Sequence, residues 1–242
     1  VGAAGKNKDL AANKGREIDA SRYVDARHSH ESATKAVELV RLGKAELLMK
    51  GSLHTDELLS AVVARDAGLR TGRRISHVFI MDVPTYHKVL IITDAAINIA
   101  PTLEDKVDIC QNAIDLALSL GVERPKLAIL AAVETVNSKM SATLDAAALC
   151  KMAERGQIRG AILDGPLAFA NAISKEAAAI KGIVSAVAGD PDILLTPDLE
   201  AGNILAKPLS HLAKSDSAGL VTRPRVPIIL PSRYHRVRAR IT

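Results

Sequence analysis

Short apolar runs alternate with longer stretches of helical periodicity along this chain of 242 residues. The apolar runs predict strands at 78–82, 89–93, 127–132, 161–164, 193–196 and 226–230. Apolar positions that recur every three or four residues predict helices at 32–49, 103–120, 143–155 and 201–213, the last kinked or divided by Pro208. Strands and helices in alternation are typical of a parallel sheet with crossover helices. The sequence therefore predicts the α/β class.

The composition excludes several classes of protein. Hydrophobic residues make up 48% of the chain and charged residues 24%, as in ordinary globular proteins. The longest apolar run, Leu127 to Val133, is far shorter than the ~20 residues of a membrane span. The aromatic residues are three Tyr and two Phe, with no Trp, which leaves little for stacking nucleic-acid bases. We expect neither a membrane nor a nucleic acid as partner.

Positive charge is concentrated near the C-terminus. The formal net charge is +5, but residues 223–242 hold six arginines and no acid. Such a local surplus fits either an anion site or a solvated tail, and both readings stay open for the arginines beyond residue 233. Cys110 and Cys150 lie in helical patterns without a CxxC motif, as buried reduced thiols do. A reduced pair predicts a cytoplasmic protein.

Polar residues follow most predicted strands at their carboxyl ends, the edge where open α/β sheets bind ligands. They are Asp94, Glu134, Thr135, Asn137, Asp164, Gly165, Asp198, Glu200, Asn203, Ser232 and Arg233. Asp and Asn are also common helix caps, so the placement alone does not decide between ligand binding and capping.

Three short motifs allow a chemical reading, whereas the GxxxxGK[ST] and GxGxxG nucleotide patterns are absent. His28 and His30 have a spacing that suits a metal, or they belong to a helix start capped by Ser29 or Ser32. The segment 50–56, Lys-Gly-Ser-Leu-His-Thr-Asp, either offers amides and polar side chains to a phosphate or is a capping loop with Thr55 or Asp56 as the cap. Ser232-Arg233, at the end of a predicted strand, fits an oxyanion.

Six longer motifs and the closing Ser232-Arg233 pair occur in order and resemble the phosphate acetyl/butyryltransferases. They are LMKGSLHT (48–55), RISHVF (74–79), TDAAINIAP (93–101), AVETVN (132–137), DGPLAF (164–169), PDLEAGN (197–203) and Ser232-Arg233. The resemblance extends from about Val24 to Arg233. It implies transfer of an acyl group between coenzyme A (CoA) and inorganic phosphate, with CoA as substrate, no bound cofactor and no metal.

The resemblance also implies an architecture. The expected subunit has two α/β domains, is similar to the isocitrate and isopropylmalate dehydrogenases, and carries its active site in the interdomain cleft. We expect an outer domain of residues 1–76 plus 220–242, an inner domain of residues 77–219, and a homodimer. The resemblance also implies that the chain begins at the family's second strand, so we expect a first strand and helix of some forty residues to be absent from it.

The candidate site residues follow from these motifs. Ser232 and Arg233 match family residues that contact the acyl-phosphate and stabilise the transition state. The substrate-binding candidates are Lys50, Gly51, Ser52, His54, Thr55, Arg74, Asn98 and Asn203. Arg233, with Arg70 or Arg74, would hold the phosphate, and Ser232 or backbone amides would donate to the tetrahedral oxyanion.

Two departures from the family pattern concern carboxylates. His235 and Ala170 stand where the family usually has Asp. The CoA thiol has a pKa near ~8.5 and benefits from a base, so His235 is either a substitute base or an exposed tail residue. Two alternatives to the enzyme therefore remain: a catalytically impaired homologue or fusion-protein domain that binds CoA or acyl-phosphate, and an oxidoreductase on the same type of fold.

Overall fold

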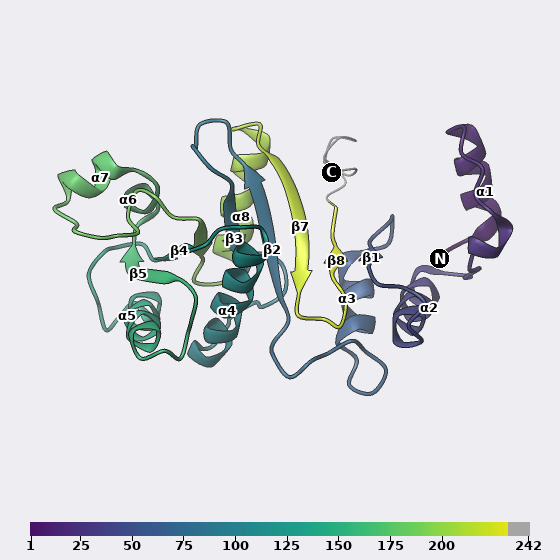
Figure 1. Cartoon of the computed structure of the whole chain (residues 1–242), viewed down its shortest axis with the longest axis horizontal. Coiled ribbons are helices and arrows are strands. Elements are labelled where there is room, and N and C mark those ends of the chain that lie inside the picture. The colour runs from purple at the N-terminus through teal and green to yellow at the C-terminus, as the bar shows by residue number, and fades with distance from the viewer. Residues whose placement is uncertain (232–242) are drawn as a thin grey trace. The chain divides into compact units, whose positions relative to one another are not determined.

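The computed structural model describes residues 1–231, which form two compact units (Figure 1). The first unit comprises residues 1–72 and 223–231, and the second residues 73–222. The assignment of an outer and an inner domain, with boundaries at 76/77 and 219/220, stays a prediction.

The first unit packs helices beside a small parallel pair of strands. Its elements are α1 (Ala4–Asn13), η1 (Ala20–Arg22), α2 (Ser29–Arg41), β1 (Leu48–Met49), α3 (Thr55–Val63) and β8 (Ile228–Ile229). Leu48 pairs with Ile228 and Met49 with Ile229. Helices α2 and α3 contribute the buried side chains of Val37, Val40, Leu58 and Val62.

The predicted helix 32–49 is wrong in its second half. Helix α2 ends at Arg41 because Gly43 adopts a φ of +67°, a conformation that costs glycine least. The N–H of Lys44 then bonds to the carbonyl of Leu39, which closes the helix end. Leu48, which the helical pattern included, lies in β1 instead.

The second unit is built on six strands in the order β7-β2-β3-β6-β4-β5. The strands are β2 (Ser76–Asp82), β3 (Leu90–Thr93), β4 (Lys126–Leu130), β5 (Ile162–Leu167), β6 (Ile193–Leu195) and β7 (Asp216–Thr222). The helices are α4 (Leu103–Ser119), α5 (Ser141–Glu154), α6 (Phe169–Ile173), α7 (Lys175–Ile180) and α8 (Leu199–His211). Pro208 does not divide helix α8, which continues past the proline and ends three residues later at His211.

The sheet is mixed, which corrects the prediction of a parallel sheet. Strand β2 runs antiparallel to both β3 and β7, whereas β3, β6, β4 and β5 pair in parallel. A short connection between β2 and β3 allows only a hairpin. Strand β7 has alternating exposed and buried residues and several small or polar side chains, so no apolar run marks it.

Each face of this sheet is covered by its own core. One core joins Val78 and Ile91 to Ile109 of α4 and Leu149 of α5. The other joins sheet residues to Ala172 of α6 and Ala206 of α8. The sheet edge between these layers, at the carboxyl ends of β3 and β6, holds several of the predicted site residues. None of the helices in residues 1–231 is long and apolar enough to cross a membrane.

Candidate active site

In the first unit, the predicted loop 50–55 follows a strand whose neighbour leads toward Ser232. The N–H of Lys50 donates to the carbonyl of Ile229 at 2.9 Å, so the carboxyl ends of β1 and β8 lie side by side. β8 ends two residues before Pro231, the last described residue. Ser232, Arg233 and His235 follow in the sequence and lie outside the described residues.

Lys50 is buried, although its side chain carries a charge. Only 7% of the residue is exposed, and its Nζ donates to the carbonyl oxygens of Gly51 at 3.3 Å and Leu53 at 3.2 Å. Carbonyl partners partly offset the cost of removing an ammonium group from water. The ammonium therefore shapes the backbone of the loop that follows it.

The start of α3 corrects the prediction that Thr55 or Asp56 is the cap. His54 is the N-cap residue, and Thr55 is the first residue of the helix. The Glu57 side chain accepts the His54 N–H at 3.0 Å, as in a capping box. Asp56 and Glu57 lie in the first helical turn, where negative charge is favourable.

His28 and His30 have separate partners in this unit. His28, and neither Ser29 nor Ser32, is the N-cap of α2, since its Nδ1 accepts the Glu31 N–H at 3.2 Å. The Nε2 of His30 lies 3.5 Å from the Glu57 carboxylate. Within residues 1–231, no group of three His, Cys, Asp or Glu is arranged to hold a metal.

In the second unit, Asp94 organises the carboxyl edge of β3. Its buried carboxylate accepts the N–H groups of Ala96 at 2.9 Å and Ile97 at 3.0 Å, with further bonds from His77 and Asn98. The Asn98 side chain adds a bond at 2.5 Å. Hydrogen bonds of this number offset the cost of burying the carboxylate and fix the turn that follows β3.

The structure brings Arg74 and Asn98 together, as two candidates from separate motifs. Arg74 Nη1 donates to Asn98 Oδ1 at 3.2 Å, and its Nε donates to Asp105 at 2.5 Å. Burial opposes the ionisation of Asp105, but the Thr102 N–H and Arg74 outweigh it and lower the pKa of that carboxyl. Much of the Arg74 charge is therefore already balanced by Asp105 at the start of α4.

Asn203 lies against the same turn from α8. Its Nδ2 donates to the Ala95 carbonyl at 3.2 Å. Thr196 donates its hydroxyl to the carbonyl oxygens of Thr93 and Asp94, which ties the ends of β3 and β6 together. Asp94 and Thr196, which were not among the site candidates, thus support the two asparagines that were.

Another polar group lies after β4. Glu134 accepts hydrogen bonds from the side chains of Asn171, which is buried, and Lys181. Asn171 directly follows Ala170, the position that lacks the expected carboxylate. Sequence reasoning noted Glu134 as a strand-end residue but had no signal for its partners, which come from α6 and the segment after α7.

Comparisons with known proteins agree with these motifs. The family model for phosphate acetyl/butyryl transferases matches residues 8–232. The chain belongs to this family. It is 59% identical to a phosphate acetyltransferase of Rhizobium meliloti over 241 residues, covering 100% of this chain and 76% of the relative.

Solved structures extend the family assignment to the fold. A branched-chain phosphotransacylase from Enterococcus faecalis V583 matches with a TM-score of 0.80 and 30% identity, over 96% of this chain and 88% of that one. A putative 4-hydroxythreonine-4-phosphate dehydrogenase from Salmonella typhimurium matches with a TM-score of 0.52 and 13% identity, over 86% and 62%. The second match concerns the fold alone and links the phosphate acetyl/butyryl transferase fold to a dehydrogenase-like α/β architecture.

Neither cysteine of this family member is suited to act as a nucleophile. Burial raises the pKa of the Cys110 thiol, and it raises the pKa of Cys150 to about 12. A thiol is nucleophilic as the thiolate, which these environments disfavour. Cys110 is buried, as the sequence predicts, whereas Cys150 is only half-buried.

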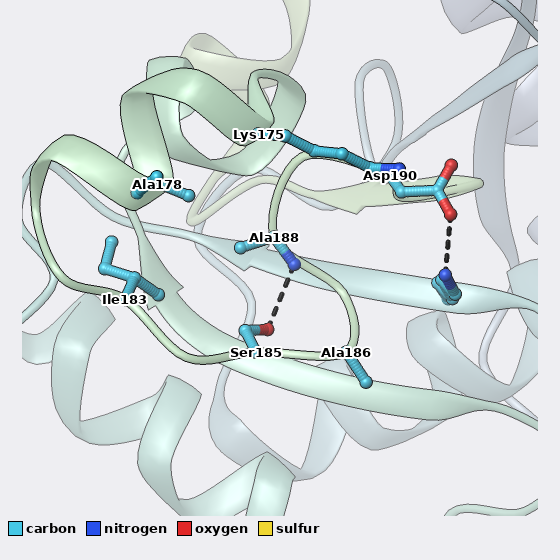
Figure 2. A pocket seen from close by; sticks show the side chains of 9 residues that line it. Lys175, Ala178, Ile183, Ser185, Ala186, Ala188 and Asp190 are labelled. Carbon is cyan, nitrogen blue, oxygen red and sulfur yellow. Dashed lines mark hydrogen bonds and ion pairs between the residues drawn. The ribbon is translucent and has the colours of Figure 1, made fainter.

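The cavity in Figure 2 lies away from the family motifs. It has a volume of about 320 Å³ and is lined by residues of β4, α7 and the segment before β6, including Lys126, Lys175, Ser185 and Asp190. Lys126 is the first residue of β4, so the cavity lies at the amino end of that strand. Asp190 binds Lys126 at 2.6 Å, Lys88 at 3.0 Å and His87 at 2.8 Å. None of the candidate site residues lines this cavity.

Proposed function

We propose that the protein transfers a short acyl group between CoA and inorganic phosphate, converting acyl-CoA and phosphate to acyl-phosphate and CoA. The observation that carries the proposal is the 59% identity to a phosphate acetyltransferase over the whole chain. The arrangement of the first unit supports it, because β1 and β8 run parallel and bring the Lys50–Thr55 loop beside the strand that leads to Ser232 and Arg233.

The proposed chemistry needs no covalent intermediate on the enzyme. In the direction of CoA acylation, the thiolate attacks the carbonyl carbon of the acyl-phosphate, and the C–O bond to phosphate breaks as the tetrahedral oxyanion collapses. Arg233 holds the phosphate, and Ser232 donates to the oxyanion, where loss of one donor typically costs ~3 to 4 kcal/mol. His235 takes the thiol proton, and His235→Ala then loses the decline in rate at acidic pH.

The other candidates bind and orient the substrates. Lys50, Gly51, Ser52, His54 and Thr55 form the phosphate-binding loop. Arg74, Asn98 and Asn203 form the second-unit part of the site. Asp94 holds the Asn98 side chain, Asn98 accepts a hydrogen bond from Arg74, and Asn203 donates to the carbonyl in the turn after Asp94. We place the active site in the cleft of a two-domain subunit similar to the isocitrate and isopropylmalate dehydrogenases, in a cytoplasmic homodimer with no metal.

A thiol-consumption assay tests the proposal. Full-length protein supplied with CoA and acetyl-, propionyl- or butyryl-phosphate should consume thiol, without added metal and without loss in a chelator. Arg233→Ala should reduce kcat/KM by about a hundredfold or more, since it removes a charge-assisted contact to the reacting group. Arg240→Ala, in the same arginine-rich segment, should keep the parent rate. Equal effects of the two variants would refute the assigned role of Arg233.

A catalytically impaired CoA-binding homologue is the second candidate, favoured by Ala170 and His235. It predicts that CoA raises the thermal midpoint while no acyl-phosphate is turned over. The same melts test the oxidoreductase alternative, for which NAD rather than CoA would protect the protein.

A further inference from the structure

Glu57 connects the phosphate-binding loop to a neighbouring helix. It is the third residue of α3, and its side chain is 14% exposed. One carboxylate oxygen accepts the hydroxyl of Ser29, the first residue of α2, at 2.7 Å. The other accepts the N–H of His54 at 3.0 Å. A single carboxylate therefore joins α2 to the end of the loop.

The peptide unit between Leu53 and His54 is held from both of its sides. Lys50 Nζ binds the Leu53 carbonyl oxygen, and Glu57 binds the His54 N–H. In a planar trans peptide the C=O and N–H bonds point in opposite directions. The Lys50 ammonium and the Glu57 carboxylate thus bind one peptide unit from opposite sides, which fixes the plane of that unit and the course of the loop.

We propose that Glu57 is a positioning residue for the loop that binds the phosphate group. This inference rests on the proposed function. Glu57 does not contact the substrate. It ties the Leu53–His54 peptide to Ser29, so that the preceding residues of the loop meet the phosphate in a preformed geometry.

The negative charge of Glu57 allows a positioning role to be distinguished from a direct electrostatic effect on the phosphate. The Ser29 hydroxyl and the His54 N–H lower the pKa of Glu57, so its carboxylate is charged at neutral pH. A negative charge near a phosphate repels it. If Glu57 acted only through its charge, removing that charge would strengthen phosphate binding, whereas loss of a positioning residue weakens it.

Kinetics of the full-length protein separate these cases. Glu57→Ala should raise the KM for acetyl-phosphate by about tenfold and leave the KM for CoA within about twofold of the parent, because the geometry of one substrate site alone is disturbed. Glu57→Gln keeps one acceptor oxygen and should fall between parent and Glu57→Ala. A lower acetyl-phosphate KM in both variants, or no change, would overturn the proposal.

Ser29 supplies an independent arm of the test. Ser29→Ala should raise the same KM, and it should add nothing in a Glu57→Ala background, because the two side chains act through one bond. The matched control is Ser32→Ala on the same helix, where the hydroxyl bonds to the His28 carbonyl and has no part in the loop. Additive effects of Ser29→Ala and Glu57→Ala, or an equal effect of Ser32→Ala, would contradict the proposal.

A measurement of phosphate binding distinguishes a failure of the positioning role from a failure of the proposed function. Calorimetric titration with inorganic phosphate should give weaker binding to Glu57→Ala than to the parent, with the fold checked by circular dichroism. If the parent protein shows no acyl transfer, the proposed function fails. If the parent is active but Glu57→Ala binds phosphate as tightly as the parent, the positioning role fails.

Discussion

Asp94 and His77 are two buried polar residues at the same sheet edge, and their side chains differ in hydrogen bonding. The Asp94 carboxylate accepts bonds from three backbone N–H groups in the turn that follows it and from the Asn98 side chain. His77 is 1% exposed, and its Nδ1 has no hydrogen-bond partner among the described residues. Burial lowers the pKa of His77 to about 4, against the opposing effect of the Asp94 charge. Asp94 is thus solvated by the protein, whereas His77 is kept neutral.

His77 should make the protein sensitive to acid. Its pKa is lower in the folded state than the ordinary ~6.5 of the unfolded chain, so the unfolded state binds more protons between the two values. The free energy of unfolding should fall as pH drops from about 6.5 toward 4, by up to about 3 kcal/mol from this residue. Urea unfolding across this range should show a shallower decline for His77→Gln than for the parent. The surface variant His211→Gln is the control, and parallel curves for parent and His77→Gln would contradict the assignment.

At the scale of the element, the periodicity of apolar residues predicts the limits of helices and strands but not which strands pair. The limits of α4 and β3 follow from apolar patterns that the core confirms, because Ile109 and Ile91 face the same buried layer. β1 was missed because two residues pair only with a strand from the other end of the chain. The direction of β2 was missed because hydrophobicity does not encode the sense of a strand.

For the candidate site too, the sequence predicts the residues within one motif but not the contacts between distant segments. The loop 50–55 and Asn98 could be found because they belong to contiguous motifs. The bonds from Ser29 to Glu57 and from Thr196 to Asp94 could not, because they join segments that only the tertiary fold brings together. Whether the candidates bind substrate stays a prediction.

Helix α8 approaches the Asp94 turn so closely that one position requires glycine. A Cβ added at Gly202 would lie 2.4 Å from the Asp94 carbonyl oxygen, which is backbone and cannot move aside cheaply. Gly202→Ala should therefore lower the free energy of unfolding by about 1 to 3 kcal/mol, as overpacking does. Gly5→Ala in α1 is the matched control, since nothing lies within 4 Å of the added Cβ. Thermal melts should separate the two, and a Gly202→Ala midpoint equal to that of the parent would show that the helix can retreat without cost.

At the scale of the whole molecule, the second unit exposes large apolar side chains on the segments that follow β3 and β6. Ile99 is 74% exposed and Ile204 68%, and the Ile99 carbonyl accepts the N–H of Leu199 at the start of the helix that carries Ile204. Apolar groups that gather on a surface mark contact sites more often than isolated ones do. This arrangement supports the proposed homodimer.

The molar mass in solution tests the predicted homodimer. Light scattering at micromolar concentration should give twice the subunit mass, and Ile204→Glu should shift the population toward the monomer because it buries a charge in an apolar contact. Leu10→Glu, on an exposed position of α1 in the first unit, is the control. A monomeric mass for the parent would contradict the homodimer. A dimeric mass for Ile204→Glu would show that the dimer contact does not include Ile204.

The pairing of β1 with β8 has a consequence for synthesis on the ribosome. The chain emerges from its N-terminus, so β1 leaves the exit tunnel long before its partner has been translated. The second unit, which is continuous from residue 73 to residue 222, has all of its strands available before residue 228 appears. We therefore expect the second unit to be able to reach its native structure before the first unit, whose strand β1 keeps an unpaired edge, exposed to chaperones and proteases, until β8 is translated.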